Sequence, residues 1–348
     1  MGDFGPSGLP PRPVHLYLLG AGFSKAISAE MPVLPELIDY IFKARTSTEL
    51  SWGFENYWPR FGNDFELWLT YLAEDNPWLS EAENTRNRAD FLQASSLLAR
   101  VILGCQARAI SSPFPQWLGK LINVWKSEQA VVASFNYDTL VERAFSYVDA
   151  GLKDMPNVPQ FRDYHQSMYA VPVLGLESRF RSEYNRRQAY PRLLKLHGSV
   201  NWWYSGSPIA AGESLFDSGI TPGWSPDAAD DPGALFAGAL EKVPFIVPPT
   251  SGKLSFFRNE AIRAQWRVAA TALESATTVY LLGYSIPEGD SLVRTFLAAS
   301  SSVKTLIPVD IDGTVAERLG RLKRHDLDER FIRPANPIPV FVESLEAG

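Results

Sequence analysis

A short apolar run that ends in a glycine-rich turn constrains this chain more than any other feature. Residues 15–19, His-Leu-Tyr-Leu-Leu, have the length and composition of a buried β-strand, and they lead directly into Gly20-Ala21-Gly22-Phe23-Ser24. Glycine allows a tight turn from a strand into a helix and a close approach of the backbone to another group. The N–H groups at the start of such a helix favour an anion, so the junction is typical of a phosphate-binding loop.

Further apolar runs alternate with segments of helical periodicity along the rest of the chain. The strands are predicted at about 130–135, 192–196, 245–247, 277–282 and 303–309, and helices are predicted at about 140–148, 257–275 and 290–300. Alternating strands and helices imply parallel strands joined by right-handed crossovers. The sequence therefore predicts an α/β fold, a Rossmann-like parallel sheet with helices on both faces.

The segments outside this alternation predict the domain organisation. Residues 1–13 are rich in glycine and proline and are expected to form a disordered lead-in to one domain over 14–348. Residues 50–128 have helical patterning and are predicted to form a helical insertion. Residues 150–190 and 205–242 have little periodicity and are expected to form loop insertions, which in compact domains are often functional.

Composition limits the classes of partner. The formal net charge of −6 gives no general attraction to nucleic acid or to anionic membranes. A local cluster of arginines is expected to be a solvated face: Arg179, Arg181, Arg186, Arg187 and Arg192. The apolar runs are shorter than a membrane span, the N-terminus does not resemble a signal peptide, and the single cysteine, Cys105, cannot form an internal disulfide. We therefore expect a cytoplasmic protein without direct nucleic-acid or membrane binding.

Polar residues follow several of the predicted strands at the point where each strand ends. They are Asn136-Tyr137-Asp138, His197-Gly198-Ser199, Gly283-Tyr284-Ser285 and Asp310, in addition to the Gly20–Ser24 turn. Ligands of parallel α/β sheets bind outside the carboxyl ends of the strands. The pattern therefore predicts a polar nucleotide crevice, with Gly283–Ser285 across it from Gly20–Ser24 and with Asp310 accepting from ribose hydroxyls.

Each of these motifs also has a purely structural interpretation. Ser24, Asn136 and Asp138 are residue types that cap helices, and His197 could be a structural histidine rather than a general base. A dehydrogenase fingerprint would place a third glycine at position 25, where Lys25 stands. The sequence has no His/Cys cluster with metal-ligand spacing, so we expect no bound metal. The absence of a P-loop lysine motif disfavours ATP hydrolysis, and the absence of Gly-x-Ser-x-Gly disfavours a serine hydrolase of that fold.

The order of these motifs resembles the sirtuin family. Sirtuins have a Gly-Ala-Gly-x-Ser loop, a Gln-Asn-x-Asp stretch, a catalytic His-Gly, a later Gly-x-Ser and an asparagine after the last strand. Phe135 stands here in place of the glutamine, and Asp310 stands in place of that asparagine. The matching residues here are Gly20–Ser24, Asn136–Asp138, His197-Gly198, Gly283–Ser285 and Asp310, which together span about 14–312. The resemblance implies a sirtuin-like NAD-binding domain over 14–348.

The departures from this pattern point to a particular branch. Protein-deacylating sirtuins carry a four-cysteine zinc module, which a chain with one cysteine cannot build, and long loops stand in its place. Leu-His-Gly-Ser-Val-Asn-Trp at 196–202 and Val-Pro-Pro-Thr at 247–250 resemble the sirtuin-like domains of prokaryotic antiviral defence systems. Those domains hydrolyse NAD, and they work as oligomers or with a partner such as an Argonaute-like protein or an ATPase.

The resemblance implies an NAD glycohydrolase that releases nicotinamide and ADP-ribose. Asn136 would orient the water and the ribose hydroxyls, His197 would act as a base, and Asp138 would hold the Asn136 loop. Gly20, Ala21, Gly22, Phe23, Ser24, Gly283, Tyr284, Ser285 and Asp310 would bind NAD. Two alternatives remain open, namely a silent regulatory subunit that binds NAD or ADP-ribose and an NAD-dependent protein deacylase.

Overall fold

The computed structural model describes most of the chain. The described residues are 15–44, 58–62, 64–149, 164–171, 173–175, 191–206, 214–221, 223–230, 235, 242–250, 254–287, 290–300, 305–322 and 326–346. The predicted lead-in at 1–13, most of the segment 150–190, much of 205–242 and four members of the arginine cluster lie outside them.

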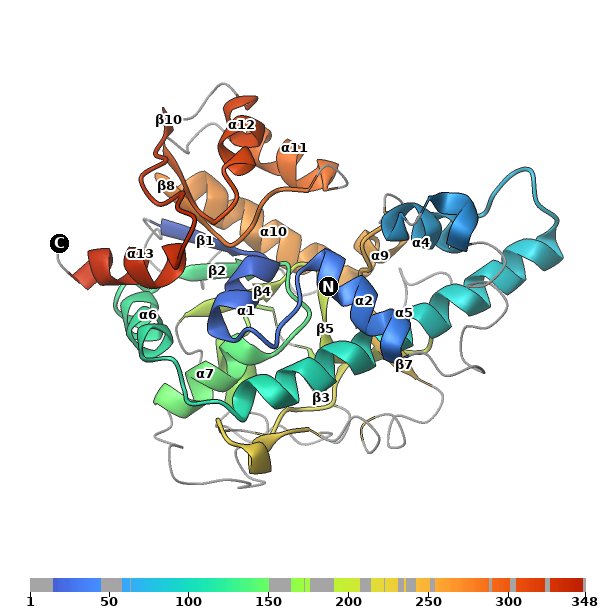
Figure 1. Cartoon of the computed structure of the whole chain (residues 1–348), viewed down its shortest axis with the longest axis horizontal. Helices are drawn as coiled ribbons and strands as arrows, with labels where there is room; N and C mark the ends of the chain where they lie inside the picture. The colour runs from blue at the N-terminus through green and yellow to red at the C-terminus, as the bar shows by residue number, and fades with distance from the viewer. Residues whose placement is uncertain are drawn as a thin grey trace, which may run out of the picture.

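A six-stranded sheet of parallel strands forms the centre of the molecule (Figure 1). Its strands are β1 (His15–Leu19), β2 (Val131–Ser134), β4 (Arg192–Lys195), β8 (Thr278–Leu282), β9 (Thr305–Val309) and β10 (Asp326–Leu327). Their spatial order is β10-β9-β8-β1-β2-β4, and each pair is parallel. The chain grows from β1 first toward β4 and then toward β10, which is the strand order of the Rossmann fold.

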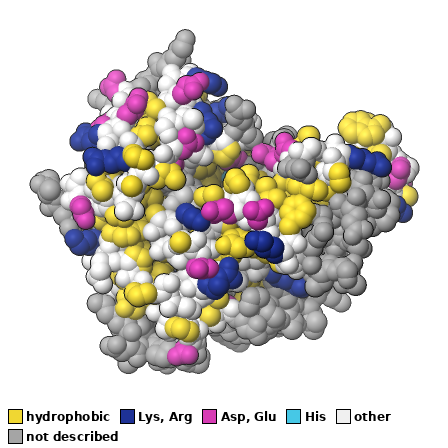
Figure 2. Space-filling model, in the orientation of Figure 1, with side chains coloured by type: hydrophobic (Ala, Val, Ile, Leu, Met, Phe, Trp, Pro, Cys, Tyr) yellow, Lys and Arg dark blue, Asp and Glu magenta, His cyan; other side chains and the backbone are white. Residues whose placement is uncertain are grey.

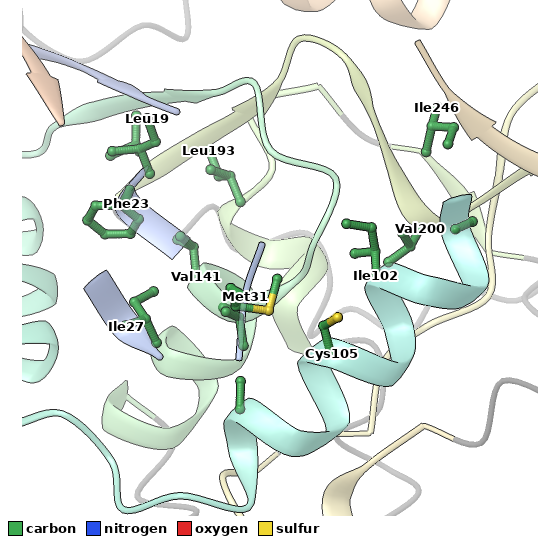
Figure 3. Close-up of a cluster of buried hydrophobic side chains, with 14 of the residues drawn as sticks. Leu19, Phe23, Ile27, Met31, Ile102, Cys105, Val141, Leu193, Val200 and Ile246 are labelled. Atoms are coloured by element: carbon green, nitrogen blue, oxygen red, sulfur yellow. The ribbon is translucent and has the colours of Figure 1, made fainter. Parts of the chain in front are cut away.

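Helices cover both faces of this sheet. Successive side chains of β1 point to opposite faces of the sheet. Tyr17 and Leu19 belong to the buried cluster on one face, and Leu16 and Leu18 belong to the cluster on the other. The first cluster contains α1 (Ala21–Ile27), α6 (Gln116–Ser127) and α7 (Leu140–Asp149), and Figure 3 shows part of it. The second contains α10 (Glu260–Ser275), α11 (Ser291–Ala299) and α12 (Thr314–Gly320). The predicted α/β fold with helices on both faces is confirmed.

The region predicted as a helical insertion contains helices that pack on the first face. They are η1 (Trp58–Phe61), α4 (Phe65–Ala73), α5 (Glu81–Ile110) and α6. Helix α5 begins with a capping box, in which Ser80 and Glu83 satisfy each other's backbone N–H groups. It runs past α2 (Leu34–Ala44) and extends beyond the body of the molecule (Figure 1). The boundaries of the insertion stay a prediction.

A second, smaller sheet was not expected from the sequence. It contains β3 (Leu174–Gly175), β6 (Phe216–Asp217), β5 (Gly198–Tyr204) and β7 (Val243–Ile246), in the order β3-β6-β5-β7. Strand β5 is antiparallel to both β6 and β7. The expectation that 245–247 joins the parallel sheet was therefore wrong. The physical reason is that β7 pairs with β5, and β5 cannot lie parallel to β4 in one sheet. Leu196 and His197 alone separate β4 from β5, whereas a parallel crossover needs a dozen or more residues.

Smaller departures concern helix and strand ends. The helix predicted over 257–275 is two helices, α9 (Leu254–Phe257) and α10, because the Asn259 side chain caps α10. Strand β10 and helix α13 (Pro337–Glu346) were not predicted, and Phe341 of α13 packs on Tyr280 of β8. Arg192, expected on a solvated face, is a buried residue of β4.

Gly283, directly after β8, is required by its conformation and by its neighbours. Its φ is +59°, and a Cβ there would lie 2.2 Å from the Phe23 backbone nitrogen. Replacing Gly283 by alanine should lower the free energy of unfolding by more than about 2 kcal/mol, because the left-handed conformation alone costs about 1–2 kcal/mol and the contact is with rigid backbone. Urea unfolding followed by tryptophan fluorescence measures the change.

Gly320→Ala is the matched control. Gly320 is the last residue of α12, and a Cβ there would meet nothing within 4 Å. Alanine in a helix is favoured over glycine by about 0.5–1 kcal/mol, so this variant should be as stable as the wild type or slightly more stable. Equal effects of the two substitutions would contradict the packing described for Gly283.

Candidate active site

The carboxyl ends of the central strands bring the predicted site residues to one edge of the sheet. Gly20 follows β1, Asn136 follows β2 after one residue, His197 follows β4 after one residue, Gly283 follows β8 and Asp310 follows β9. The direction of chain growth reverses between the neighbours β1 and β8. Such a reversal is where open α/β sheets bind their ligands.

The glycines of the β1–α1 turn serve close packing against the end of β8. The Gly22 N–H donates to the Gly283 carbonyl at 2.9 Å, and the Gly20 N–H donates to the Leu282 carbonyl at 3.1 Å. A Cβ on Gly20 would lie 2.6 Å from the Gly283 carbonyl oxygen. The prediction that Gly283 faces Gly20–Ser24 across a crevice was therefore wrong. The two turns are in backbone contact, and the Gly22 N–H is not available to a phosphate.

Ser24 lies inside α1 rather than at its cap, which is the Gly20 position. Its hydroxyl donates to the Asp138 carboxylate, with Oγ and Oδ2 2.6 Å apart. The Asn136 amide nitrogen donates to the same Ser24 Oγ at 2.9 Å and to the Gly20 carbonyl at 2.7 Å. All three side chains are buried. Ser24, Asn136 and Asp138 therefore form one hydrogen-bonded cluster, which we call the Ser24 cluster and which joins the ends of β1 and β2.

Asp138 also has the capping role that its residue type suggests. Its Oδ1 accepts from the Leu140 N–H at 3.1 Å, at the start of α7. The structural and functional interpretations therefore coincide here, because the same carboxylate caps α7 and holds Ser24.

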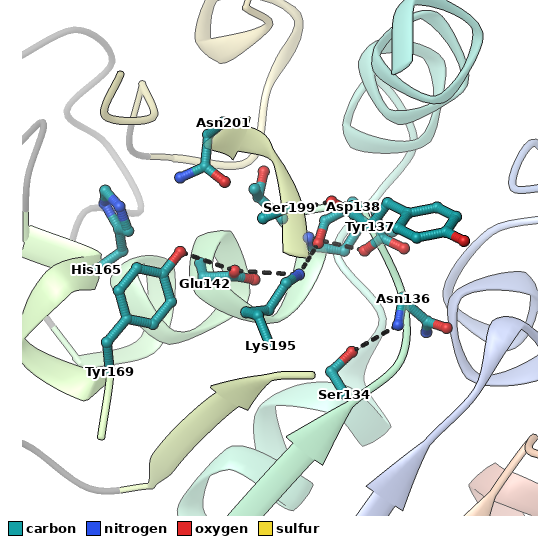
Figure 4. Close-up of polar contacts among 12 residues, drawn as sticks. Ser134, Asn136, Tyr137, Asp138, Glu142, His165, Tyr169, Lys195, Ser199 and Asn201 are labelled. Carbon is teal, nitrogen blue, oxygen red and sulfur yellow. Dashed lines mark hydrogen bonds and ion pairs between the residues drawn. The ribbon is translucent and has the colours of Figure 1, made fainter. Parts of the chain in front are cut away.

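Asn136 uses its amide nitrogen within the protein. Among the described residues, no hydrogen bond engages its side-chain oxygen, and the residue is 9% exposed. An amide oxygen in this position can accept a hydrogen bond from a water or a sugar hydroxyl. The Asn136 backbone N–H donates to Ser134 Oγ at 3.1 Å (Figure 4). This hydrogen bond holds the loop from which the Asn136 side chain extends.

His197 lies in an aromatic environment at the end of β4. Its ring centroid is 5.1 Å from that of Phe135 and 6.1 Å from that of Phe257, and the residue is 5% exposed. Phe257 in turn packs edge-to-face on Trp266 of α10 at 5.6 Å. Sequence reasoning missed Phe257 and Trp266, because an aromatic residue on a helix gives no signal that it faces a site rather than the core.

Tyr284 and Ser285 make contacts within the protein. The Tyr284 hydroxyl donates to Asp290 at 2.8 Å, its ring stacks on Phe135 at 4.4 Å, and burial raises the pKa of its phenol. The Ser285 carbonyl accepts from Arg318 at 2.7 Å. Tyr284 thus packs behind Phe135, whose ring contacts His197.

Asp310 is buried at the end of β9. Its Oδ1 accepts from the Asp312 N–H at 2.9 Å, and burial raises the pKa of the carboxyl above its usual value. A buried carboxylate gains from hydroxyl donors. Asp310 therefore has the chemistry predicted for a ribose contact, and that role stays a prediction.

The described residues give no support to a metal site or a membrane span. Within the described ranges, no group of three or more histidine, cysteine or acidic side chains could hold a metal ion. No helix in that part of the chain is long and apolar enough to span a membrane. Basic and acidic side chains alternate over the face shown in Figure 2, so the described residues form no patch of a single charge there.

Comparison with known proteins gives one kind of similarity. No protein-family model matches the chain, and no curated protein matches it. Among solved structures, it is similar to a chain described under "Structural Basis for the Mechanism and Regulation of Sir2 Enzymes". The alignment covers 97% of this chain and 93% of that chain, with 13% identity and a TM-score of 0.41. The fold is therefore assigned from the strand order of the sheet itself.

The Ser24 hydroxyl is expected to stabilise the folded chain. Ser24→Ala should lower the free energy of unfolding by about 1.5–3 kcal/mol, because the buried Asp138 carboxylate loses a charge-assisted hydrogen bond. Ser127→Ala removes an exposed hydroxyl that bonds only the Val124 carbonyl, and this control should change the stability by less than about 0.5 kcal/mol. Equal unfolding midpoints for both variants in urea would contradict the role of the Ser24 cluster.

Asp310 is expected to lower the stability of the folded chain as the pH rises. Because its folded-state pKa is raised, the charged carboxylate destabilises the folded chain, and this penalty grows as the pH rises from the unfolded pKa through the folded pKa. Asp310→Asn should therefore be more stable than the wild type at neutral pH, and the difference should vanish in acid. Urea unfolding at several pH values measures it.

Asp328→Asn should change stability in the opposite direction. The hydrogen bond from Arg330 lowers the pKa of the Asp328 carboxyl, so its charged form stabilises the folded chain above the unfolded pKa. This variant should be less stable than the wild type at neutral pH and equal to it in acid. The same pH trend for both variants would show that burial does not govern Asp310.

Proposed function

We propose that this chain is an NAD glycohydrolase, which cleaves NAD to nicotinamide and ADP-ribose. The observation that carries the proposal is the Ser24 cluster, which holds Asn136 beside the β1–β8 reversal of a Rossmann-type sheet. The ring of Phe135, next to Asn136, contacts His197. An amide oxygen acceptor and an imidazole are thus brought to the region where nucleotides bind such sheets.

Each residue has a distinct role in this proposal. Asn136 orients the attacking water and the ribose hydroxyls through its side-chain oxygen. His197 acts as the base that takes a proton from the water or from a ribose hydroxyl. The nicotinamide–ribose bond breaks as the water oxygen bonds to the ribose carbon. Asp138 keeps the loop in place through Ser24 and the start of α7.

The cysteine content of the chain favours water as the acceptor over a peptide. A four-cysteine zinc module accompanies protein deacylation in the sirtuin family that the sequence resembles, and this chain has one cysteine. This supports a hydrolase over the alternative of a protein deacylase.

The substrate is proposed to lie along the ends of β1, β8 and β9. Ala21, Phe23 and Ser24 would line the pyrophosphate side together with the glycines at 20, 22 and 283. Tyr284 and Ser285 would shape the wall, and Asp310 would accept from the adenosine ribose hydroxyls, as acids at such strand ends do. No metal is invoked, because His197 and Asn136 supply the proton acceptor and the water-orienting group.

The biological setting is proposed from the sequence resemblance. An enzyme that depletes NAD fits an effector of bacterial antiphage defence acting in the cytoplasm by abortive infection. Constant activity would harm the host, so assembly into an oligomer or with a partner such as an ATPase or an Argonaute-like protein would switch it on. The helices of 50–128 provide surface for such contacts.

The test is to incubate the purified chain with NAD and to follow nicotinamide and ADP-ribose by chromatography. Asn136→Ala and His197→Ala should each lower the rate by about 100-fold or more, because general-base assistance and substrate positioning contribute at least that much. Circular dichroism and melting temperature should show that both variants are folded.

His15→Ala is the matched control for His197→Ala. His15 stands at the start of β1, at the opposite edge of the sheet, where its Nδ1 lies 3.2 Å from Glu128. This variant should keep wild-type activity. Full activity of the Asn136 and His197 variants would refute the site. Calorimetric binding of NAD without any product would favour the silent subunit, and NAD-dependent cleavage of an acyl-lysine peptide would favour the deacylase.

A further inference from the structure

A buried lysine contacts the loop that carries Asn136. Lys195 is the last residue of β4, and it is 1% exposed. Its ammonium donates to the backbone carbonyl of Asp138 and lies 3.3 Å from Oε1 of Glu142 (Figure 4). The proposed reaction gives this charged group no role.

Among the described residues, the buried carboxylate of Glu142 balances the charge of Lys195. Glu142 of α7 is fully buried, and its Oε1 also accepts from the Tyr169 hydroxyl at 3.1 Å. Its second oxygen, Oε2, has no hydrogen-bond partner among the residues that the structure describes. Burying an ion pair costs several kcal/mol for each ion, and apolar residues of similar size often stabilise a core as well or better. Stability alone therefore does not account for Lys195 and Glu142.

The contacts of Lys195 lead to the proposed catalytic loop. The ammonium holds the Asp138 carbonyl, the Asp138 carboxylate accepts from Ser24, and Ser24 accepts from the Asn136 amide. His197 is two residues further along the same chain segment. Lys195 thus connects the end of β4, which places His197, to the loop after β2, which places Asn136.

We infer that Lys195 is a positioning residue that holds Asn136 in register with His197, with Glu142 as its counter-charge. This inference rests on the proposed NAD hydrolysis. Lys195 touches no substrate in this scheme, so it should affect the rate of the bound complex rather than the binding of NAD. A displacement of about 1 Å in a reacting group costs about 100-fold in rate.

Arg143 provides a matched control for loss of a buried cation. It is also fully buried on α7, and its guanidinium bonds the Thr221 and Ala228 carbonyls at 2.7 Å and pairs with Asp230. These partners of the guanidinium belong to the segment 221–230 and not to the loop 136–138. Arg143→Met should therefore lower stability without a specific loss of turnover.

The experiment compares Lys195→Met with Arg143→Met in kcat, KM, calorimetric NAD affinity and melting temperature. Both variants should melt at lower temperature than the wild type. Lys195→Met should lose about 100-fold in kcat while KM and NAD affinity stay at the wild-type values, and Arg143→Met should keep its kcat. Glu142→Gln keeps the shape of the acceptor and provides a second test should Lys195→Met fail to fold. It should also lower kcat and leave KM unchanged.

Two results would overturn the inference. One is a kcat of Lys195→Met or Glu142→Gln no lower than that of Arg143→Met. The other is a raised KM with an unchanged kcat, which would indicate a role in substrate binding. The activity of the wild-type chain distinguishes failure of the inference about Lys195 from failure of the proposed function. A wild type that releases no nicotinamide refutes the hydrolase and the inference together, whereas an active wild type with active variants refutes the inference alone.

Discussion

The close backbone contact between the β1–α1 turn and the end of β8 is the constraint on which the rest of the site depends. Gly20 and Gly22 meet Gly283 at distances that leave no room for a side chain, and the Gly22 N–H donates to the Gly283 carbonyl. This contact sets the position of α1 relative to the sheet. Since Ser24 lies on α1, the contact also sets where Asn136 and Asp138 can hydrogen-bond.

The polar residues behind the site form a continuous buried network rather than isolated pairs. Ser24 and Asp138 join the first two strands, and Lys195 and Glu142 extend the network to β4 and α7. Such networks are costly when partly satisfied and rigid when satisfied. An aromatic cluster of Phe135, Phe257, Trp266 and Tyr284 closes the other side of His197. The imidazole of His197 thus packs against aromatic side chains at the end of β4, and Asn136 follows the neighbouring strand β2.

Apolar runs in the sequence were sufficient to predict all strands of the central sheet except β10, because a glycine or a polar residue ends each run within two positions of the strand. They were not sufficient for β5, in which Asn201 interrupts the apolar pattern and binds Asp217 in the folded chain. The glycines at 20, 22 and 283 are predicted to contact a ligand, and in the folded chain they also pack closely on one another and on Tyr284. Local sequence cannot distinguish the two, since both require the absence of a side chain.

The sequence by itself determined the α/β class and the placement of Gly20, Asn136, His197, Gly283 and Asp310 at strand ends, because burial and strand direction follow from local patterns. Only the tertiary structure decided which of these groups meet. Ser24 and Asn136 are 112 residues apart and bond at 2.9 Å, and Lys195 reaches Asp138 across 57 residues. Such partners depend on strand order and on how closely α1 approaches β8, and no local pattern encodes either.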